Sequence, residues 1–310
     1  MAHWILKAAV QRSIALLPRS QSWNYLLQKY VTRSIELDEG RLRTYLQLYA
    51  RRHIENWFFS HLKSDFTVME LGTGWYPVIP IAFYLCGASK IWTIDKQPLL
   101  RPANVRRAVQ LFVDLAQRQE LMALLPRVQA DRLAALLSLN NNGHVVPYSE
   151  MLARLNIHVL VLDARRTGLE QGSVDFFFSN AVLSEIPEHI LLAIFAEFRR
   201  VASSEATMSH YVSLVDPYVS FDDAVTPFHF LQYADRTWRL LNNSLHYHNR
   251  LRIPDYRRIH GSAGFRILLE DNERGSPEDL EKVRLAKEFQ RYSRDELLVL
   301  RSWMLLAPQN

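Results

Sequence analysis

The sequence predicts an α/β fold built on a largely parallel sheet. Short apolar runs typical of buried strands alternate several times with amphipathic helical stretches. Glycines follow the first apolar run directly, as expected for a tight turn between a strand and a helix. With 310 residues and 48% hydrophobic content, the chain is long enough to bury a sizeable core around such a sheet.

Residues 1–62 predict an N-terminal helical cap. Apolar side chains recur there at helical spacing, among them Leu42, Leu46 and Tyr49. Residues 1–19 form an amphipathic pattern without an apolar run long enough for a signal-peptide core or a membrane span. We therefore expect this helix to pack on the main domain, and we expect neither export nor membrane insertion.

Residues 63–310 predict the main domain, which opens with a strand, a turn and a helix. The pattern places a strand over Phe66–Leu71, a helix over Val78–Cys86, a second strand over Lys90–Asp95 and a helix from Ala103. This order is typical of successive βαβ units with parallel strands.

The remaining pattern continues this alternation with two interruptions. Residues 121–155 indicate a helical insertion broken at Asn140-Asn-Asn-Gly, and residues 216–248 form an aromatic-rich segment. Between and after these interruptions, we expect helices beginning at Pro187 and Pro254 and strands at His158–Asp163, Ser173–Ser179, Thr207–Leu214, Phe265–Glu270 and Ser302–Ala307.

Composition argues against two classes of protein. The 37 Lys and Arg residues exceed the 32 Asp and Glu residues only slightly and are scattered, whereas nucleic-acid binding usually needs a dense basic surface. Cys86 is the only cysteine, so the chain can form neither an internal disulfide nor a cysteine-based zinc site. We expect a reducing, cytoplasmic location and no metal.

The segment Glu70-Leu-Gly-Thr-Gly ends the first strand and predicts a ligand turn, because Gly72 and Gly74 let backbone approach a ligand closely. A dinucleotide site favours a third glycine at position 77, where this chain has Pro77. The sequence also lacks the glycine-rich loop with Lys and Ser or Thr that binds phosphates. NAD and phosphate ligands are therefore disfavoured.

Acidic residues stand at three strand ends: Glu70, Asp95 and Asp163. Each one alone is more often a turn or helix cap, but their coincidence indicates one ligand crevice. A carboxylate such as Asp95 can accept hydrogen bonds from both hydroxyls of a ribose. Carboxylates also suit the cationic sulfonium and amino groups of S-adenosylmethionine.

These residues, with Asp163-Ala-Arg and the segment Val174–Asn180, resemble the ordered motifs of Rossmann-like, class I S-adenosylmethionine-dependent methyltransferases. The resemblance covers residues 63–271, and the final apolar run is similar to the family's late antiparallel strand. It implies a mixed sheet of about seven strands with helices on both faces.

The resemblance also implies a cofactor site. It places the methionine part near Glu70, Gly72 and Gly74, the ribose at Asp95, the adenine at Asp163 and Ala164, and the sulfonium end beside Asn180. Tyr76 stands where the family often has another glycine, so its ring is expected to reshape the methionine pocket.

Methyl transfer is an in-line displacement that depends mainly on positioning and water exclusion, so a general base is optional. His210 is the candidate base, with Tyr211 in its place if the strand register shifts by one residue. The alternative for His210 is a hydrogen-bonded core histidine. Glu185 is a further catalytic candidate, or else it caps or pairs with the helix beginning at Pro187.

Candidate acceptor-binding residues lie in and after the aromatic segment: Tyr218, His229, Tyr233 and Arg250. Aromatic faces can line a pocket or shield a cation, and an arginine can hold an anionic acceptor. The aromatic residues can equally form a local core, and Arg250 can belong to a solvated basic stretch.

The sequence thus predicts a cytoplasmic S-adenosylmethionine-dependent methyltransferase of a small metabolite or glycan precursor. The helical N-terminus and the aromatic segment would cover the acceptor. One alternative is an alkyl transferase or cyclase that attacks the methionine chain and releases methylthioadenosine, which Tyr76 and the aromatic segment motivate. Another is a cofactor-binding subunit without turnover. The sequence indicates no oligomeric state.

Overall fold

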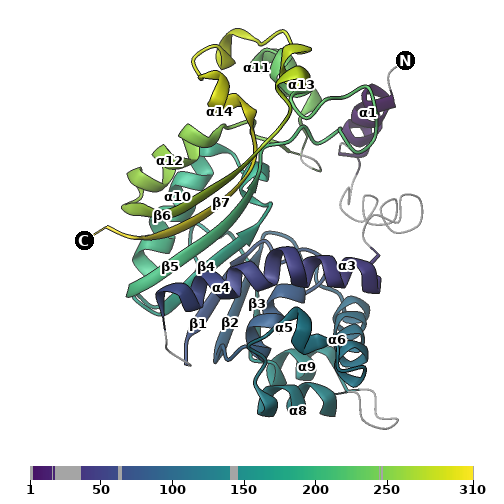
Figure 1. Cartoon of the computed structure of the whole chain (residues 1–310), viewed down its shortest axis with the longest axis vertical. Helices are drawn as coiled ribbons and strands as arrows, with labels where there is room; N and C mark the ends of the chain where they lie inside the picture. The colour runs from purple at the N-terminus through teal and green to yellow at the C-terminus, as the bar shows by residue number, and fades with distance from the viewer. Residues whose placement is uncertain are drawn as a thin grey trace.

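The computed structural model describes residues 3–15, 17, 36–61, 65–139, 146–243, 245 and 247–309. Its centre is one seven-stranded sheet in the order β3-β2-β1-β4-β5-β7-β6, with helices on both faces (Figure 1). The predicted mixed sheet is therefore confirmed. The expected end of the cap at Leu62 and the break at residues 140–143 lie outside the described residues.

Six strands run parallel and one runs against them. β7 lies between β5 and β6 and pairs antiparallel with both. The strands are β1 (Thr67–Leu71), β2 (Lys90–Asp95), β3 (Ile157–Val161), β4 (Val174–Asn180), β5 (Ala202–Ser213), β6 (Phe265–Arg274) and β7 (Val299–Pro308). β6 and β7 are longer than their apolar patterns predict, because they pair with each other from Phe265 to Arg274. β5 begins earlier than predicted, at Ala202, which pairs with Val174 of β4.

The centre of the sheet is covered on both faces, which explains its continuous apolar strands. Phe176 and Phe178 of β4 pack into one core cluster, and Phe177 packs into the cluster on the opposite face. The first cluster lies under α3 (Glu39–Thr44), η2 (Tyr45–Ala50), α4 (Arg51–Ser60), α5 (Val78–Leu85) and α6 (Pro102–Gln117). The second lies under α10 (Glu188–Val201) and α12 (Ile253–Ser262).

The predicted insertion forms three short helices at the β3 end of the sheet. They are α7 (Leu121–Leu124), α8 (Ala130–Ser138) and α9 (Tyr148–Arg154), and their apolar side chains join the same core as α6. Figure 1 shows α8 and α9 at the end of the molecule opposite α1.

A separate helical lobe extends beyond the sheet at the other end. It contains α1 (His3–Ala15), η4 (His229–Gln232), α11 (Asp235–Leu241), α13 (Pro277–Glu281), η5 (Lys287–Phe289) and α14 (Arg294–Leu298) (Figure 1). A third apolar cluster holds it together, and Trp4 of α1, Phe230 and Trp238 are among its members. The described parts of the predicted cap therefore divide: α1 joins this lobe, while α3, η2 and α4 lie on the sheet.

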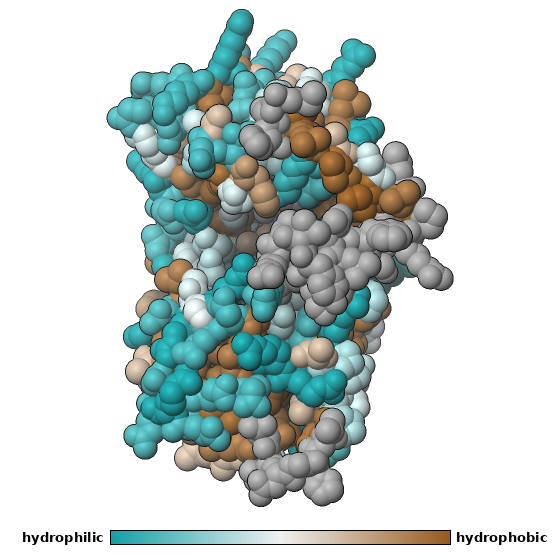
Figure 2. Space-filling model, turned by 90° about the vertical axis from the view of Figure 1, so that its right-hand side faces the viewer, coloured by the Kyte–Doolittle hydropathy of each residue, from teal (hydrophilic) through white to brown (hydrophobic). Residues whose placement is uncertain are grey.

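The outer side of α1 is apolar. Ile5, Leu6 and Val10 are exposed, and Figure 2 shows a brown area at the end of the molecule where α1 lies. Within the described part of the chain, no helix is long and apolar enough to cross a membrane.

Candidate functional site

A cavity of about 1060 Å³ opens at the carboxyl ends of β1, β2 and β4. Open parallel sheets collect ligands at this edge, because loops leaving neighbouring strands meet there. The cavity is lined by the turn after β1, the ends of β2 and β4, and the residues of η2 that lie over them. All eight residues expected at the cofactor belong to this lining: Glu70, Gly72, Gly74, Tyr76, Asp95, Asp163, Ala164 and Asn180.

Two glycines shape the turn after β1 for different reasons. Gly72 has φ +80°, and a Cβ built on it would lie 2.4 Å from a methyl carbon of Val182. Gly74 has φ +67°, but a Cβ there would meet nothing within 4 Å. Gly72 therefore permits close packing against the loop after β4, whereas Gly74 is needed for its backbone conformation.

Asp95 connects this turn to the end of β2. Its carboxylate accepts hydrogen bonds from the backbone N–H of Gly74 at 3.2 Å and of Gln97 at 3.1 Å. Two contacts leave other lone pairs of an ionised carboxylate available to hydroxyl donors. Burial raises the pKa of Asp95, and the backbone hydrogen bonds oppose that rise.

Glu70 and Asn180 belong to the cavity lining, and each carries a buried acceptor oxygen. Glu70 is 4% exposed, and burial raises its pKa to about 8, with the charge of Asp95 adding to the rise and the nearby Thr73 hydroxyl opposing it. Among the described residues, neither Glu70 Oε2 nor Asn180 Oδ1 has a hydrogen-bond partner. Buried polar atoms are normally paired, so these two indicate that a ligand donor belongs beside them.

Glu185 ends the short helix η3 (Leu183–Glu185) and faces the same cavity. Its side chain is exposed to the cavity, while the surrounding protein and the charge of Asp95 raise its pKa to about 7. It does not cap α10, because the N-cap position of that helix is Pro187 and no side-chain hydrogen bond caps it. Glu185 therefore remains a candidate for chemistry.

Asp163 and Ala164, the two residues expected at the adenine, differ in whether their side chains are free to contact a ligand. Asp163 is exposed and pairs with Arg165 Nη2 at 2.5 Å, and this hydrogen bonding holds the Asp163 pKa at about 2. Ala164 is buried and presents an apolar wall. Asp163 is thus already paired with a cation, whereas no cation among the described residues lowers the pKa of Glu70 or Glu185.

The N-terminal helices contribute a part of the site that the sequence did not identify by residue. Tyr76 accepts a hydrogen bond from the backbone N–H of Leu37 at 3.4 Å, which ties the segment before α3 to the glycine turn. Tyr45 and Tyr49 then line the cavity from η2, with their rings 5.5 Å apart. η2 is a π-helix, and such distortions often occur at functional sites.

The position of His210 contradicts its expected role as a base. It lies in the middle of β5, fully buried, with Nδ1 2.8 Å from Ser179 Oγ and its ring stacked 5.7 Å from His260. It does not line the cavity, and burial lowers its pKa well below the ordinary value. The alternative, a hydrogen-bonded core histidine, is correct.

Tyr211 also lies outside the cavity lining. Its side chain projects from the opposite face of β5, where its ring lies 5.1 Å from those of Tyr49 and Trp303. Tyr211 supports Tyr49 from behind, so the structure contradicts a direct catalytic role.

The four expected acceptor-binding residues lie in or beside the helical lobe core and do not line the cavity. Tyr218 is buried beside Trp4. His229 contacts the Asp216 carboxylate at 3.3 Å and the Tyr233 hydroxyl at 3.2 Å. The aromatic segment therefore forms a local core, which was the alternative to an acceptor pocket.

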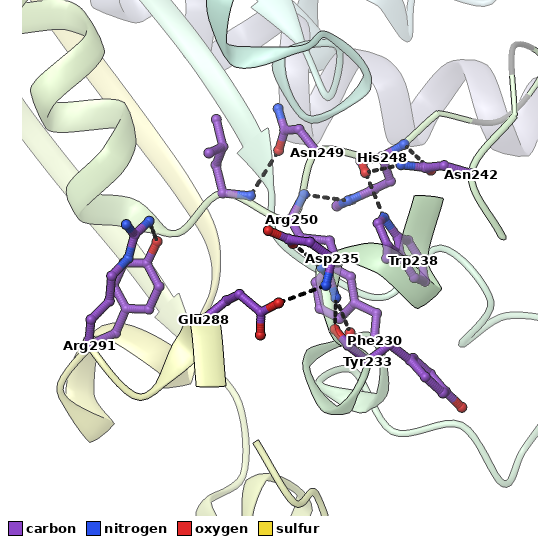
Figure 3. A network of polar contacts seen from close by, with 12 residues as sticks. Phe230, Tyr233, Asp235, Trp238, Asn242, His248, Asn249, Arg250, Glu288 and Arg291 are labelled. Atoms are coloured by element: carbon purple, nitrogen blue, oxygen red, sulfur yellow. Dashed lines mark hydrogen bonds and ion pairs between the residues drawn. The ribbon is translucent and has the colours of Figure 1, made fainter. Parts of the chain in front are cut away.

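Arg250 is likewise bound within the lobe. Its guanidinium donates to the Phe230 carbonyl at 2.9 Å, to the Tyr233 carbonyl and to the Asp235 carboxylate at 2.5 Å (Figure 3). With its side chain 2% exposed, Arg250 is neither solvated nor available to an anionic acceptor. It joins η4 to α11, and the predicted acceptor role is wrong.

Comparisons with known proteins give similarity in fold only. No protein-family model matches the chain, and no curated protein sequence matches it. An S-adenosylmethionine-dependent methyltransferase from Methanosarcina mazei is 12% identical, with a TM-score of 0.44 over 81% of this chain and 96% of that one. One from Aquifex aeolicus is 14% identical, with a TM-score of 0.41 and coverage of 88% and 98%.

A geranyl diphosphate C-methyltransferase from Streptomyces coelicolor, in a complex with Mg²⁺, geranyl diphosphate and S-adenosylhomocysteine, is 11% identical. Its TM-score is 0.45, and the match covers 83% of this chain and 77% of that one. The chain is thus similar to methyltransferase structures, and its own sheet has the mixed seven-stranded form that its sequence motifs imply.

Proposed function

We propose that the protein binds S-adenosylmethionine in this cavity and transfers its methyl group to a small molecule. The supporting observation is that Glu70, Asp95 and Glu185 line one cavity. Within the described residues, no cationic side chain lowers the pKa of any of the three. Uncompensated carboxylates favour a ligand with cationic groups, and this cofactor carries a sulfonium and an ammonium.

The residues present suit the cofactor part by part. The free lone pairs of Asp95 would accept hydrogen bonds from the ribose hydroxyls, and Ala164 would contact the adenine ring. The unsatisfied oxygens of Glu70 and Asn180 would accept hydrogen bonds from the methionine ammonium. When bound, the cofactor supplies an electrophilic methyl group on a sulfonium sulfur.

The cavity also favours a small acceptor. Its volume of about 1060 Å³ is at the upper end of the usual range for small-molecule sites, so a second small molecule fits beside the cofactor. η2 and the Leu37 segment cover the site, which would exclude water and hold the acceptor in line. A small metabolite or glycan precursor in a reducing cytoplasm is consistent with this site and with the free, buried Cys86.

Calorimetry with S-adenosylhomocysteine tests the binding site. The wild type should bind it, and Asp95→Ala should weaken binding at least about tenfold through loss of the ribose contacts. The Asp271→Ala variant, which removes an exposed acid of β6, serves as the control and should bind normally. Absence of binding by the wild type would refute the proposed cofactor.

Mass spectrometry of the nucleoside product then tests the reaction. The protein is incubated with S-adenosylmethionine, with and without a metabolite extract. S-adenosylhomocysteine formed only with the extract supports methyl transfer to a small acceptor. Methylthioadenosine above its spontaneous background would instead support attack on the methionine chain.

A further inference from the structure

The cavity holds more carboxyl groups than the proposed cofactor has cationic groups. S-adenosylmethionine has a sulfonium, an ammonium and a carboxylate, which together leave a single positive charge. Glu70, Asp95 and Glu185 line the cavity, and no cationic side chain of the described residues lowers the pKa of any of them. The cationic side chains of the lining act elsewhere: Arg165 and Lys96 lower the pKa of Asp163, and Arg41 donates to the Glu36 carbonyl.

Glu185 is the carboxylate that the cofactor leaves available. Glu70 is almost fully buried at the glycine turn, and Asp95 is held by the backbone of Gly74 and Gln97. Glu185 instead stands on the loop after β4 with its side chain exposed to the cavity. No hydrogen bond or attractive charge within the described residues lowers its pKa.

Aromatic rings line the same cavity. Tyr45 and Tyr49 extend from η2, and Tyr49 is held in place by Tyr211 at 5.1 Å between ring centres. The faces of tyrosine rings attract organic cations. Carboxylate and aromatic surfaces together recognise a positively charged nitrogen, and they disfavour an anionic acceptor.

We propose that the acceptor is a small amine and that the Glu185 carboxylate binds its ammonium group and then takes its proton. This inference rests on the proposed methyl transfer. The freed nitrogen lone pair forms the new bond to the methyl carbon as the sulfur–carbon bond breaks, and the bonding pair stays on sulfur. The products are the methylated ammonium, S-adenosylhomocysteine and protonated Glu185. A carboxyl whose pKa is about 7 can accept that proton near neutral pH.

Three probes of one shape and different charge test this assignment: choline, neutral 3,3-dimethylbutan-1-ol and anionic 3,3-dimethylbutyrate. Each is titrated by calorimetry at pH 8 into protein saturated with S-adenosylhomocysteine. Choline should bind at least about tenfold more tightly than the neutral probe, and the anion should bind most weakly.

Three variants test which residues of the cavity make this preference. Glu185→Gln should remove most of the preference for choline, while its affinity for S-adenosylhomocysteine shows that the variant is folded. Glu188→Gln is the matched control, because Glu188 lies nearby in the chain but pairs with Arg258 outside this cavity. It should retain the preference. Tyr45→Leu should weaken choline binding about threefold or more.

The outcomes distinguish the two proposals. If the wild type fails to bind S-adenosylhomocysteine, the proposed function is wrong and the amine inference falls with it. If S-adenosylhomocysteine binds but choline binds no better than the neutral probe, only the amine acceptor is overturned. An equal preference for choline in wild type and Glu185→Gln would overturn the role of Glu185.

Discussion

The cavity and the helical lobe differ in whether their charged side chains have partners of opposite charge or hydrogen-bond acceptors. In the cavity, no cation among the residues that the structure describes pairs with Glu70 or Glu185, and burial raises their pKa values to about 8 and about 7. In the lobe, the buried Arg250 donates to two carbonyls and to Asp235. Arg252 is fully buried where the lobe meets the sheet, and it donates to the carbonyls of Leu214, Leu297 and Val299.

This difference distinguishes charged side chains that hold segments of the fold together from charged side chains that are available to a ligand. A buried guanidinium with several acceptors fixes neighbouring segments to one another, and a ligand would have to break those contacts. A carboxylate without a partner destabilises the ligand-free protein, and a cationic ligand would remove that cost. Partners, rather than residue type, therefore locate the candidate site.

The largest expected effect on the free energy of unfolding comes from a substitution where the lobe meets the sheet. Arg252→Met should lower the free energy of unfolding by about 3 to 5 kcal/mol, because three buried carbonyls lose their donor. Urea denaturation measures this loss. Arg257→Met removes an exposed pair with Glu270 and should cost at most about 1 kcal/mol. Comparable losses in both variants would contradict the structural role of Arg252.

In the cavity, removing a charged side chain should instead raise the free energy of unfolding. Because the folded-state pKa of Glu70 is raised above its unfolded value, its ionisation costs stability as pH rises from about 4.5 through about 8. Glu70→Gln should therefore raise the free energy of unfolding at pH 9 by about 2 kcal/mol and weaken S-adenosylhomocysteine binding. A variant less stable than wild type at pH 9 would show that Glu70 is structural.

A buried histidine predicts that the protein loses stability in acid. His260 is fully buried, its ring nitrogens have no partner among the described residues, and burial lowers its pKa to about 3. Its neutral form stabilises the fold above pH 6.5, and this contribution is lost as pH falls, by about 2 kcal/mol at pH 5. His260→Leu should flatten the dependence of unfolding free energy on pH between 6.5 and 5. An unchanged slope would exclude His260 as its source.

The smallest effect concerns the cover of the cavity. Tyr76→Phe removes the hydroxyl that accepts the Leu37 N–H at 3.4 Å, a contact worth about 0.5 to 1 kcal/mol. We expect a similar loss of S-adenosylhomocysteine affinity and faster hydrogen exchange in residues 36–44, measured by mass spectrometry. Unchanged exchange there would show that Tyr76 does not hold this segment.

The succession of strands along the chain and the glycine turn could be predicted because their signals are local. Glu70, Gly72, Gly74 and Asp95 each end or follow a short apolar run, and a parallel sheet brings such ends together. Tyr45 and Tyr49 could not be assigned in this way. They reach the cavity only because α3 and η2 fold back over the sheet, a long-range arrangement without a pattern at those positions.

The incorrect acceptor residues have the same origin. Tyr218, His229 and Arg250 have the side chains of a binding site, but their partners lie in distant segments of the chain. For His210, the sequence showed a strand but not which face of it meets the helices α10 and α12. Neither burial nor pairing of these groups follows from local spacing.

The place of β7 in the sheet has a consequence for biosynthesis. Residues 299–308 leave the ribosome after the other six strands, yet they lie between β5 and β6. Until then, the nascent chain presents one open edge of β5 and an isolated β6, and such unpaired edges favour aggregation. The strand ends of β1, β2 and β4 that line the cavity are all synthesised earlier. A chain paused before residue 299 would therefore already contain them, while still needing protection by a chaperone.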